Sequence, residues 1–155
     1  MGLIIKNKIK QLMAGYPTVS DKYDVAGAVL GGSKAVKFGD VVNIANGYFE
    51  SCESTALTAA GDVGGIVVAT NVKVPENFPG TIVQVNPGEA FNLLVKGFIA
   101  VNLNAGVTES NIKPNTPVYV TPAGKFTNVS ASNFALPNTV FTGVVENGVA
   151  EIYIR

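Results

Sequence analysis

Two short motifs bring serine and lysine together and are the nearest that this sequence comes to catalytic chemistry. GGSKA at residues 31–35 resembles a nucleophile elbow that lacks its last glycine, and SNIK at residues 110–113 matches Ser-x-x-Lys. The sequence has no histidine, so the commonest general base is missing, and Ser-His-Asp and Cys-His pairs are excluded. Pro114 disfavours helical geometry at Lys113, although Ser-x-x-Lys chemistry needs one helix face shared with Ser110. We therefore predict that the protein is not an enzyme.

The acidic residues and the single cysteine follow no metal or cofactor pattern. The 11 carboxylates are scattered and do not have the spacing of a calcium loop. Glu50 and Glu53 are too close in sequence to define a glycosidase pair by themselves. Most zinc sites are excluded because histidine is absent. Cys52 permits no internal disulfide and is expected to be an inert, small side chain. We predict no metal and no cofactor.

The composition favours a protein that binds other proteins. The chain has 155 residues, which suits one domain, and 47% of them are hydrophobic, 14% are charged and the formal net charge is zero. Nothing resembles the clustered Lys and Arg of a nucleic-acid surface. No apolar run approaches the ~20 residues that span a bilayer, and lysines interrupt the apolar residues near the N-terminus, which argues against a signal peptide. So little charge favours an oligomer or a docked subunit over a lone monomer.

Short β-type runs separated by turn residues dominate the sequence after residue 36. Asn46-Gly47 and Asn147-Gly148 each sit between two such runs, and this dipeptide is typical of a two-residue hairpin with a type I′ turn. PVYVTPAGKFTN, at residues 117–128, predicts a third hairpin with Gly124 at a left-handed bulge position. Residues 90–103 predict one long strand, or two strands divided at Gly97. We expect an all-β fold, a small β-barrel or sandwich built from hairpins, with an extended N-terminal arm.

The last hairpin also predicts which side chains face the core. A turn at Asn147-Gly148 pairs Val145 with Ala150, and continuing the ladder pairs Val144 with Glu151, Gly143 with Ile152, and Phe141 with Ile154. Residues two apart share a face of a strand. One face of the hairpin is then wholly apolar and is expected to point inward: Phe141, Gly143, Val145, Ala150, Ile152 and Ile154.

Residues 1–36 differ in character from the rest, so we divide the chain into an arm (1–36) and a β domain (37–155). The first residues form a short amphipathic segment that would dock on protein, and tyrosine is enriched at binding hot spots. In the alternative, the first thirteen residues pack on their own domain or on a sister subunit. The candidate partner-binding residues all lie in this arm: Ile5, Ile9, Leu12, Tyr16, Pro17 and Tyr23.

The order of these segments resembles the structural cement (decoration) proteins of tailed bacteriophage heads. The resemblance is carried by QLMAGYPTVSDKYDVAGAVLGG, KFGDVVNI, GIVVATN, PGEAFNLLVKGFIAVNL, PNTPVYVTPAGKFTN and VFTGVVENGVAEIYIR. It implies an auxiliary subunit that binds the major capsid protein on the outer surface of an assembled head, usually as a homotrimer, and stabilises the head against internal DNA pressure. The protein would then belong to the virion and be assembled in the cytoplasm of a bacterial host.

Three other functions remain open from the residues alone. A head fibre or a tail component shares all the composition arguments. A small β-barrel module that binds an oligonucleotide or saccharide would need a basic groove with exposed aromatic residues, which the sequence does not predict. A hydrolase would have to use Ser110 with Lys113, or a pair of carboxylates.

Overall fold

The computed structural model describes residues 12–18, 23–69 and 84–155, and its regular structure is almost entirely β, as predicted. A 3₁₀ turn, η1, covers Ala60–Asp62 and is the only helical geometry in residues 53–62. A second 3₁₀ turn, η2, covers Glu109–Asn111. The strands are β1 (Tyr23–Val29), β2 (Val36–Lys37), β3 (Val41–Ala45), β4 (Tyr48–Ser51), β5 (Val63–Val68), β6 (Gln84–Val85), β7 (Ala90–Asn102), β8 (Thr116–Val120), β9 (Phe126–Thr127), β10 (Phe134–Glu146) and β11 (Val149–Ile154).

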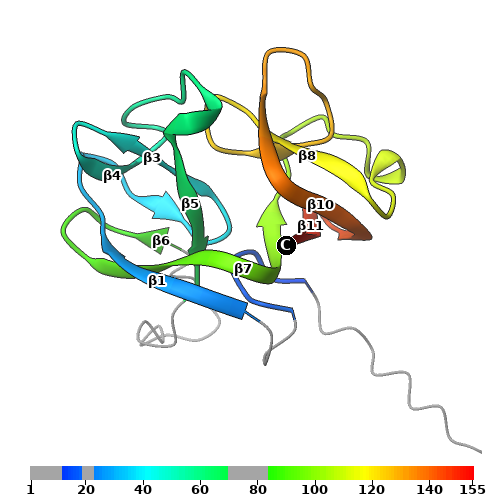
Figure 1. Cartoon of the computed structure of the whole chain (residues 1–155), viewed down its shortest axis with the longest axis horizontal. Coiled ribbons are helices and arrows are strands. Elements are labelled where there is room, and N and C mark those ends of the chain that lie inside the picture. Colours follow the sequence, from blue (N-terminus) through cyan, green and yellow to red (C-terminus); the bar gives the residue numbers. More distant parts are fainter. Residues whose placement is uncertain (1–11, 19–22, 70–83) are drawn as a thin grey trace, which may run out of the picture.

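One long strand, β7, joins the two halves of the main sheet (Figure 1). The strand order is β4-β3-β5-β7-β11-β10-β8-β9, with β1 paired to β7 off this path. Up to and including Gly97, β7 pairs with β1, and its residues 92–94 also pair with β5; from Gly97 onward it pairs with β11. Gly97 has a φ of 123°, so a glycine stands where the strand changes partners. Of the two alternatives for residues 90–103, the single long strand is confirmed.

Both halves of the sheet curl until their outer strands meet another part of the chain. An isolated bridge between Leu30 and Phe49 joins the residue after β1 to β4, and a bridge between Leu103 and Phe126 joins the residue after β7 to β9. The small β2–β6 ladder is separate from this sheet. A strongly curled sheet built from hairpins agrees with the predicted barrel or sandwich class.

Two apolar clusters form the core, and the central strands contribute to both. Side chains that are neighbours in sequence enter different clusters because they point to opposite faces of a strand. The larger cluster includes Phe141 and Ile152, and the smaller one includes Leu30, Phe38 and Phe91. The alternation runs through three strands: Val41, Ile66 and Leu94 belong to the larger cluster, and Val42, Val67 and Leu93 to the smaller.

The predicted hairpins are present. Asn46 and Gly47 have φ values of 52° and 80°, and Asn147 and Gly148 have 51° and 76°, as type I′ turns require. The third hairpin joins β8 and β9, and there Gly124 has a φ of 83°.

The predicted register of the last hairpin is correct near the turn and wrong beyond it. Glu146 pairs with Val149 and Val145 with Ala150, but Phe141 then pairs with Ile152 and not with Ile154. A bulge leaves residues 142–144 opposite Glu151 alone, so the predicted pairs for Val144, Gly143 and Phe141 are wrong. Gly143 adopts a φ of 92°, and a Cβ atom there would lie 2.6 Å from Cδ of Pro114. The bulge therefore needs glycine.

The predicted inward face survives this correction. The bulge adds two residues to one strand, and a shift by two keeps each side chain on its own face. Phe141, Ala150 and Ile152 are fully buried in the larger cluster, while Val145 and Ile154 are partly buried against it.

The described parts of the predicted arm lie against the β domain. β1 pairs with β7 along its whole length, and residues 15–18 are hydrogen-bonded to the second half of β7. Leu30 and Val36 are buried in the smaller cluster. The boundary at residue 36 stays a prediction, and Ile5 and Ile9 lie outside the described residues.

Candidate functional site

The segment from residue 12 to residue 18 is held to the domain through its backbone. The N–H of Gly15 donates to the carbonyl of Ala100 at 2.7 Å, and the N–H of Ala69 donates to the carbonyl of Gly15 at 2.7 Å. Gly15 has a φ of 82°, and a Cβ atom there would lie 2.5 Å from Cβ of Phe38. The chain can approach so closely only because this residue is glycine. Leu12 is buried within the domain.

The structure brings three of the six candidate residues together along β7. The N–H of Ala100 donates to the carbonyl of Tyr16 at 3.2 Å, Pro17 bridges to Ile99, and Tyr23 pairs with Gly97. Tyr16 and Tyr23 are 40% and 39% exposed, so their backbones are fixed while their rings remain available to a partner. The buried Leu12 is not presented in this way.

Other exposed apolar side chains continue this surface along β1. Val25 and Val29 on β1 are 41% and 57% exposed, and Val95 on β7 is 57% exposed. The register of the two strands shifts between Asp24 and Val25, which leaves Val95 as the extra residue of a bulge. We call Tyr23, Val25, Val29 and Val95 the exposed strip.

The sequence reasoning did not identify the three valines of this strip. Val25 and Val29 lie in VAGAV, where apolar and polar residues do not alternate, so the sequence gives no sign of which side is covered. It also missed Phe98 and Tyr153, which are half-buried and stack with ring centroids 4.3 Å apart. The sequence signal near that pair is the long apolar run of β7, which does not show which of its side chains remain partly exposed.

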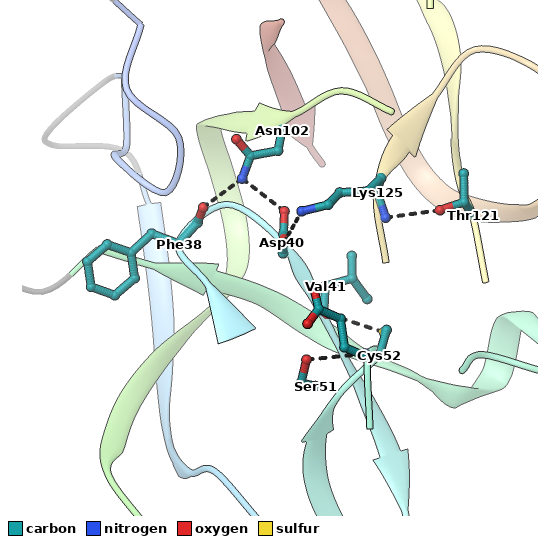
Figure 2. Close-up of polar contacts among 9 residues, drawn as sticks. Phe38, Asp40, Val41, Ser51, Cys52, Asn102, Thr121 and Lys125 are labelled. Atoms are coloured by element: carbon teal, nitrogen blue, oxygen red, sulfur yellow. Dashed lines mark hydrogen bonds and ion pairs between the residues drawn. The ribbon is translucent and has the colours of Figure 1, made fainter. Parts of the chain in front are cut away.

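A buried polar cluster lies elsewhere, where β3, the end of β7 and the β8–β9 turn meet (Figure 2). Asp40 forms an ion pair with Lys125, and Nδ2 of Asn102 donates to Oδ1 of Asp40 at 2.9 Å. The same Nδ2 donates to the carbonyl of Phe38 at 2.9 Å. Burial raises the pKa of Asp40 above its usual value, and the contacts with Lys125 and Asn102 oppose that shift.

This cluster joins segments that are far apart in the sequence, and its nearby thiol is unreactive. Burial raises the pKa of Cys52 to about 12, and the negative charge of Asp40 acts in the same direction. Its Sγ donates to the carbonyl of Val41 at 3.4 Å. A thiol that stays protonated is a poor nucleophile, so the expectation of an inert Cys52 agrees with its surroundings.

The two serine motifs found in the sequence are part of ordinary turns. The backbone N–H and Oγ of Ser33 both contact Oγ of Ser54, at 3.3 and 3.5 Å. Ser110 lies in η2. Lys113 lies just after η2, and its backbone N–H donates to Oγ1 of Thr116 at 3.1 Å. In the described part of the chain, no three His, Cys, Asp or Glu residues are placed to hold a metal ion. No helix in those same residues is long and apolar enough to cross a membrane.

Comparison with known proteins identifies both the fold and the family. The model of a family described as "Structural cement protein (E217 gp24/Pam3 gp6)" matches residues 5–155. A chain of the solved structure titled "The capsid of Myoviridae Phage XM1" is similar with a TM-score of 0.68 and 16% sequence identity, over 99% of this chain and 96% of that chain. At that identity the likeness shows the fold. No curated protein matches the chain.

The structure thus has an all-β fold that is shared with a chain of a solved phage capsid, and it exposes apolar side chains along β1 and β7. The family match is more specific, because it covers nearly the whole sequence. The chain belongs to the structural cement protein family of phages. The family predicted from the sequence is thereby confirmed, and so is its function of decorating and stabilising a capsid in the virion.

Proposed function

We propose that this protein binds the major capsid protein on the outside of an assembled phage head through Tyr16, Pro17 and Tyr23, and that it does so as a homotrimer. The observation that carries the capsid function is the family match over residues 5–155. The contact residues rest on their exposure and on the backbone hydrogen bonds that fix them beside β7. Assembly takes place in the cytoplasm of the bacterial host.

Exposed tyrosines on a fixed backbone suit this role for an energetic reason. A tyrosine ring buries a large area on binding and has few rotatable bonds, so little conformational entropy is lost. The backbones of Tyr16 and Tyr23 are ordered before binding by their pairing with Ala100 and Gly97. At these two residues, the conformational cost of binding is then limited to ordering the rings. The proposed role needs no catalytic group, metal or cofactor, and it involves no nucleic acid or membrane.

The test is the binding of purified variants to heads that lack this protein. Deleting residues 1–36 would remove strand β1 and the buried side chains of Leu30 and Val36. Such a deletion would therefore damage the fold itself. Substituting the tyrosines avoids this problem. Truncating a hot-spot side chain costs about 2 kcal/mol or more, which is roughly a thirtyfold loss of affinity. We expect at least that loss from the double variant Tyr16→Ala/Tyr23→Ala in co-sedimentation with heads.

Tyr48→Ala is the matched control, because Tyr48 is 65% exposed and lies at the tip of the β3–β4 hairpin. It should bind heads like the unsubstituted protein. Heads decorated with the double variant should also release their DNA at a lower temperature than heads decorated with the control. Undiminished binding by the double variant, with the fold intact by circular dichroism, would contradict the proposed contact.

A further inference from the structure

The two Asn-Gly dipeptides of the chain, Asn46-Gly47 and Asn147-Gly148, carry a reaction of their own. The backbone nitrogen of the glycine can attack Cγ of the asparagine, and glycine hinders this attack least because it has no side chain. The new N–Cγ bond forms while the Cγ–Nδ2 bond breaks, so a succinimide ring remains. Ammonia leaves and takes the proton of the glycine amide. A water molecule then opens the ring to aspartate or isoaspartate.

The two dipeptides match in every respect that the turn itself determines. The asparagines have φ values of 52° and 51°, and the glycines have 80° and 76°. All four residues are exposed, so water reaches both turns. A type I′ turn holds the glycine nitrogen away from Cγ of the asparagine, so each turn must open before the ring can form. The reaction rates therefore depend on how firmly the rest of the chain holds each turn.

The turn at Asn147 is held on both sides of its glycine. The N–H of Gly148 donates to Oε1 of Glu109 at 2.7 Å, and the carbonyl of Gly148 accepts from the N–H of Leu103 at 2.9 Å. Both bonds must break before the nitrogen of Gly148 can rotate toward the side chain of Asn147. The first bond also engages the proton that the nitrogen has to lose.

The turn at Asn46 has no such contacts. Ala45 pairs with Tyr48 and closes the turn, but neither the N–H nor the carbonyl of Gly47 is hydrogen-bonded within the described part of the chain. We propose that Asn46 is a modification site that deamidates spontaneously in water, and that the contacts of Gly148 with Glu109 and Leu103 protect Asn147 from the same reaction.

The positions of the two hairpins give this difference a structural consequence. Deamidation of Asn46 adds a negative charge, beside the exposed Tyr48, to a chain whose formal net charge is zero. Isoaspartate also lengthens the backbone of the turn, which loosens the hairpin of β3 with β4, the last strand of the sheet order. The same change at Asn147 would act on β11, which lies between β7 and β10 and carries the fully buried Ile152. The protected turn is thus the one next to the core.

Peptide mass spectrometry of the aged protein tests the difference without any substitution. The folded protein is incubated at mildly alkaline pH, which promotes loss of the amide proton, and the two Asn-Gly peptides are followed with time. Asn46 should convert at least about tenfold faster than Asn147, because a hydrogen bond to a charged group makes opening that much rarer. In protein unfolded by urea the contacts of Gly148 are absent, so the two asparagines should react at similar rates.

A substitution of Glu109 tests the protection itself. Glu109→Ala removes the acceptor of the Gly148 N–H, so conversion of Asn147 should become about tenfold faster or more, and that of Asn46 should not change. Glu146→Ala is the matched control, because it removes an exposed carboxylate beside the same turn and no hydrogen bond from Gly148. Circular dichroism checks that both variants are folded.

Two results would overturn the proposal. Equal rates for Asn46 and Asn147 in the folded, unsubstituted protein would show that the contacts of Gly148 give no protection. An unchanged or slower conversion of Asn147 in folded Glu109→Ala would show that the carboxylate does not protect this turn, and a slower one would make it a base that promotes the reaction.

Discussion

The burial of Ile152 gives the most direct test of how the core is arranged. Ile152 is fully buried in the larger cluster and pairs with the equally buried Phe141. Ile152→Ala removes buried side-chain atoms from a closely packed site and leaves a cavity. Substitutions of this type cost about 2–5 kcal/mol. We expect Ile152→Ala to lower the free energy of unfolding by an amount in this range.

The same substitution at an exposed isoleucine is the control. Ile44 is 48% exposed on β3, so truncating it removes roughly half as much buried area and leaves no closed cavity. Its loss should be about 1 kcal/mol or less. Both free energies come from urea denaturation, with the slope of the transition compared to check that the unfolded states are alike. In thermal unfolding, each kcal/mol should lower the midpoint by about 2–4 °C.

Comparable losses from the two variants would refute the assignment of inner and outer faces. The bulge at residues 142–144 shifts the pairing register by two residues, which is an even number. An even shift keeps Phe141 and Ile152 on the same, inner face of the hairpin. An odd offset would place one of them at the surface. A small loss from Ile152→Ala would therefore indicate that the strands are paired differently from the structure.

Two further predictions concern the bulge and the buried polar cluster. Gly143→Ala should lower the free energy of unfolding by about 2–4 kcal/mol in urea denaturation, because a Cβ atom at a φ of 92° is strained and would collide with Pro114. Gly61→Ala is the control and should change that free energy by less than about 0.5 kcal/mol, because a Cβ atom at Gly61 would have nothing within 4 Å. The pKa of Asp40 is raised in the folded protein, so the folded state holds a proton at this carboxyl more strongly than the unfolded state does. The stabilisation that this proton gives to the folded state is fully present below pH 3.8, the usual pKa of the group, and is lost as pH rises through the raised pKa. The stability of the unsubstituted protein relative to Asp40→Asn should therefore increase as pH falls through that window, and a difference that is constant with pH would contradict the shift.

Local turn chemistry explains why so much of the fold could be predicted from the sequence. Asn46-Gly47 and Asn147-Gly148 require positive φ at both positions, and this alone fixes two hairpins and their first pairs. The bulge at Gly143 could not be found in this way. It depends on Pro114, which is distant in sequence and meets the strand only in the folded chain. The contact of Lys125 with Asp40 is also long-range, as the two residues are 85 positions apart.

The candidate site was harder to predict than the fold, because the exposure of a side chain depends on whether distant parts of the chain pack over it. Tyr16 and Tyr23 were identified from residue type and are exposed, whereas Leu12 was chosen from the apolar spacing of the amphipathic N-terminal segment and is buried. Between Leu12 and Tyr16 the chain turns, and there Gly15 approaches Phe38 closely. The sequence shows a glycine there but does not show its neighbour.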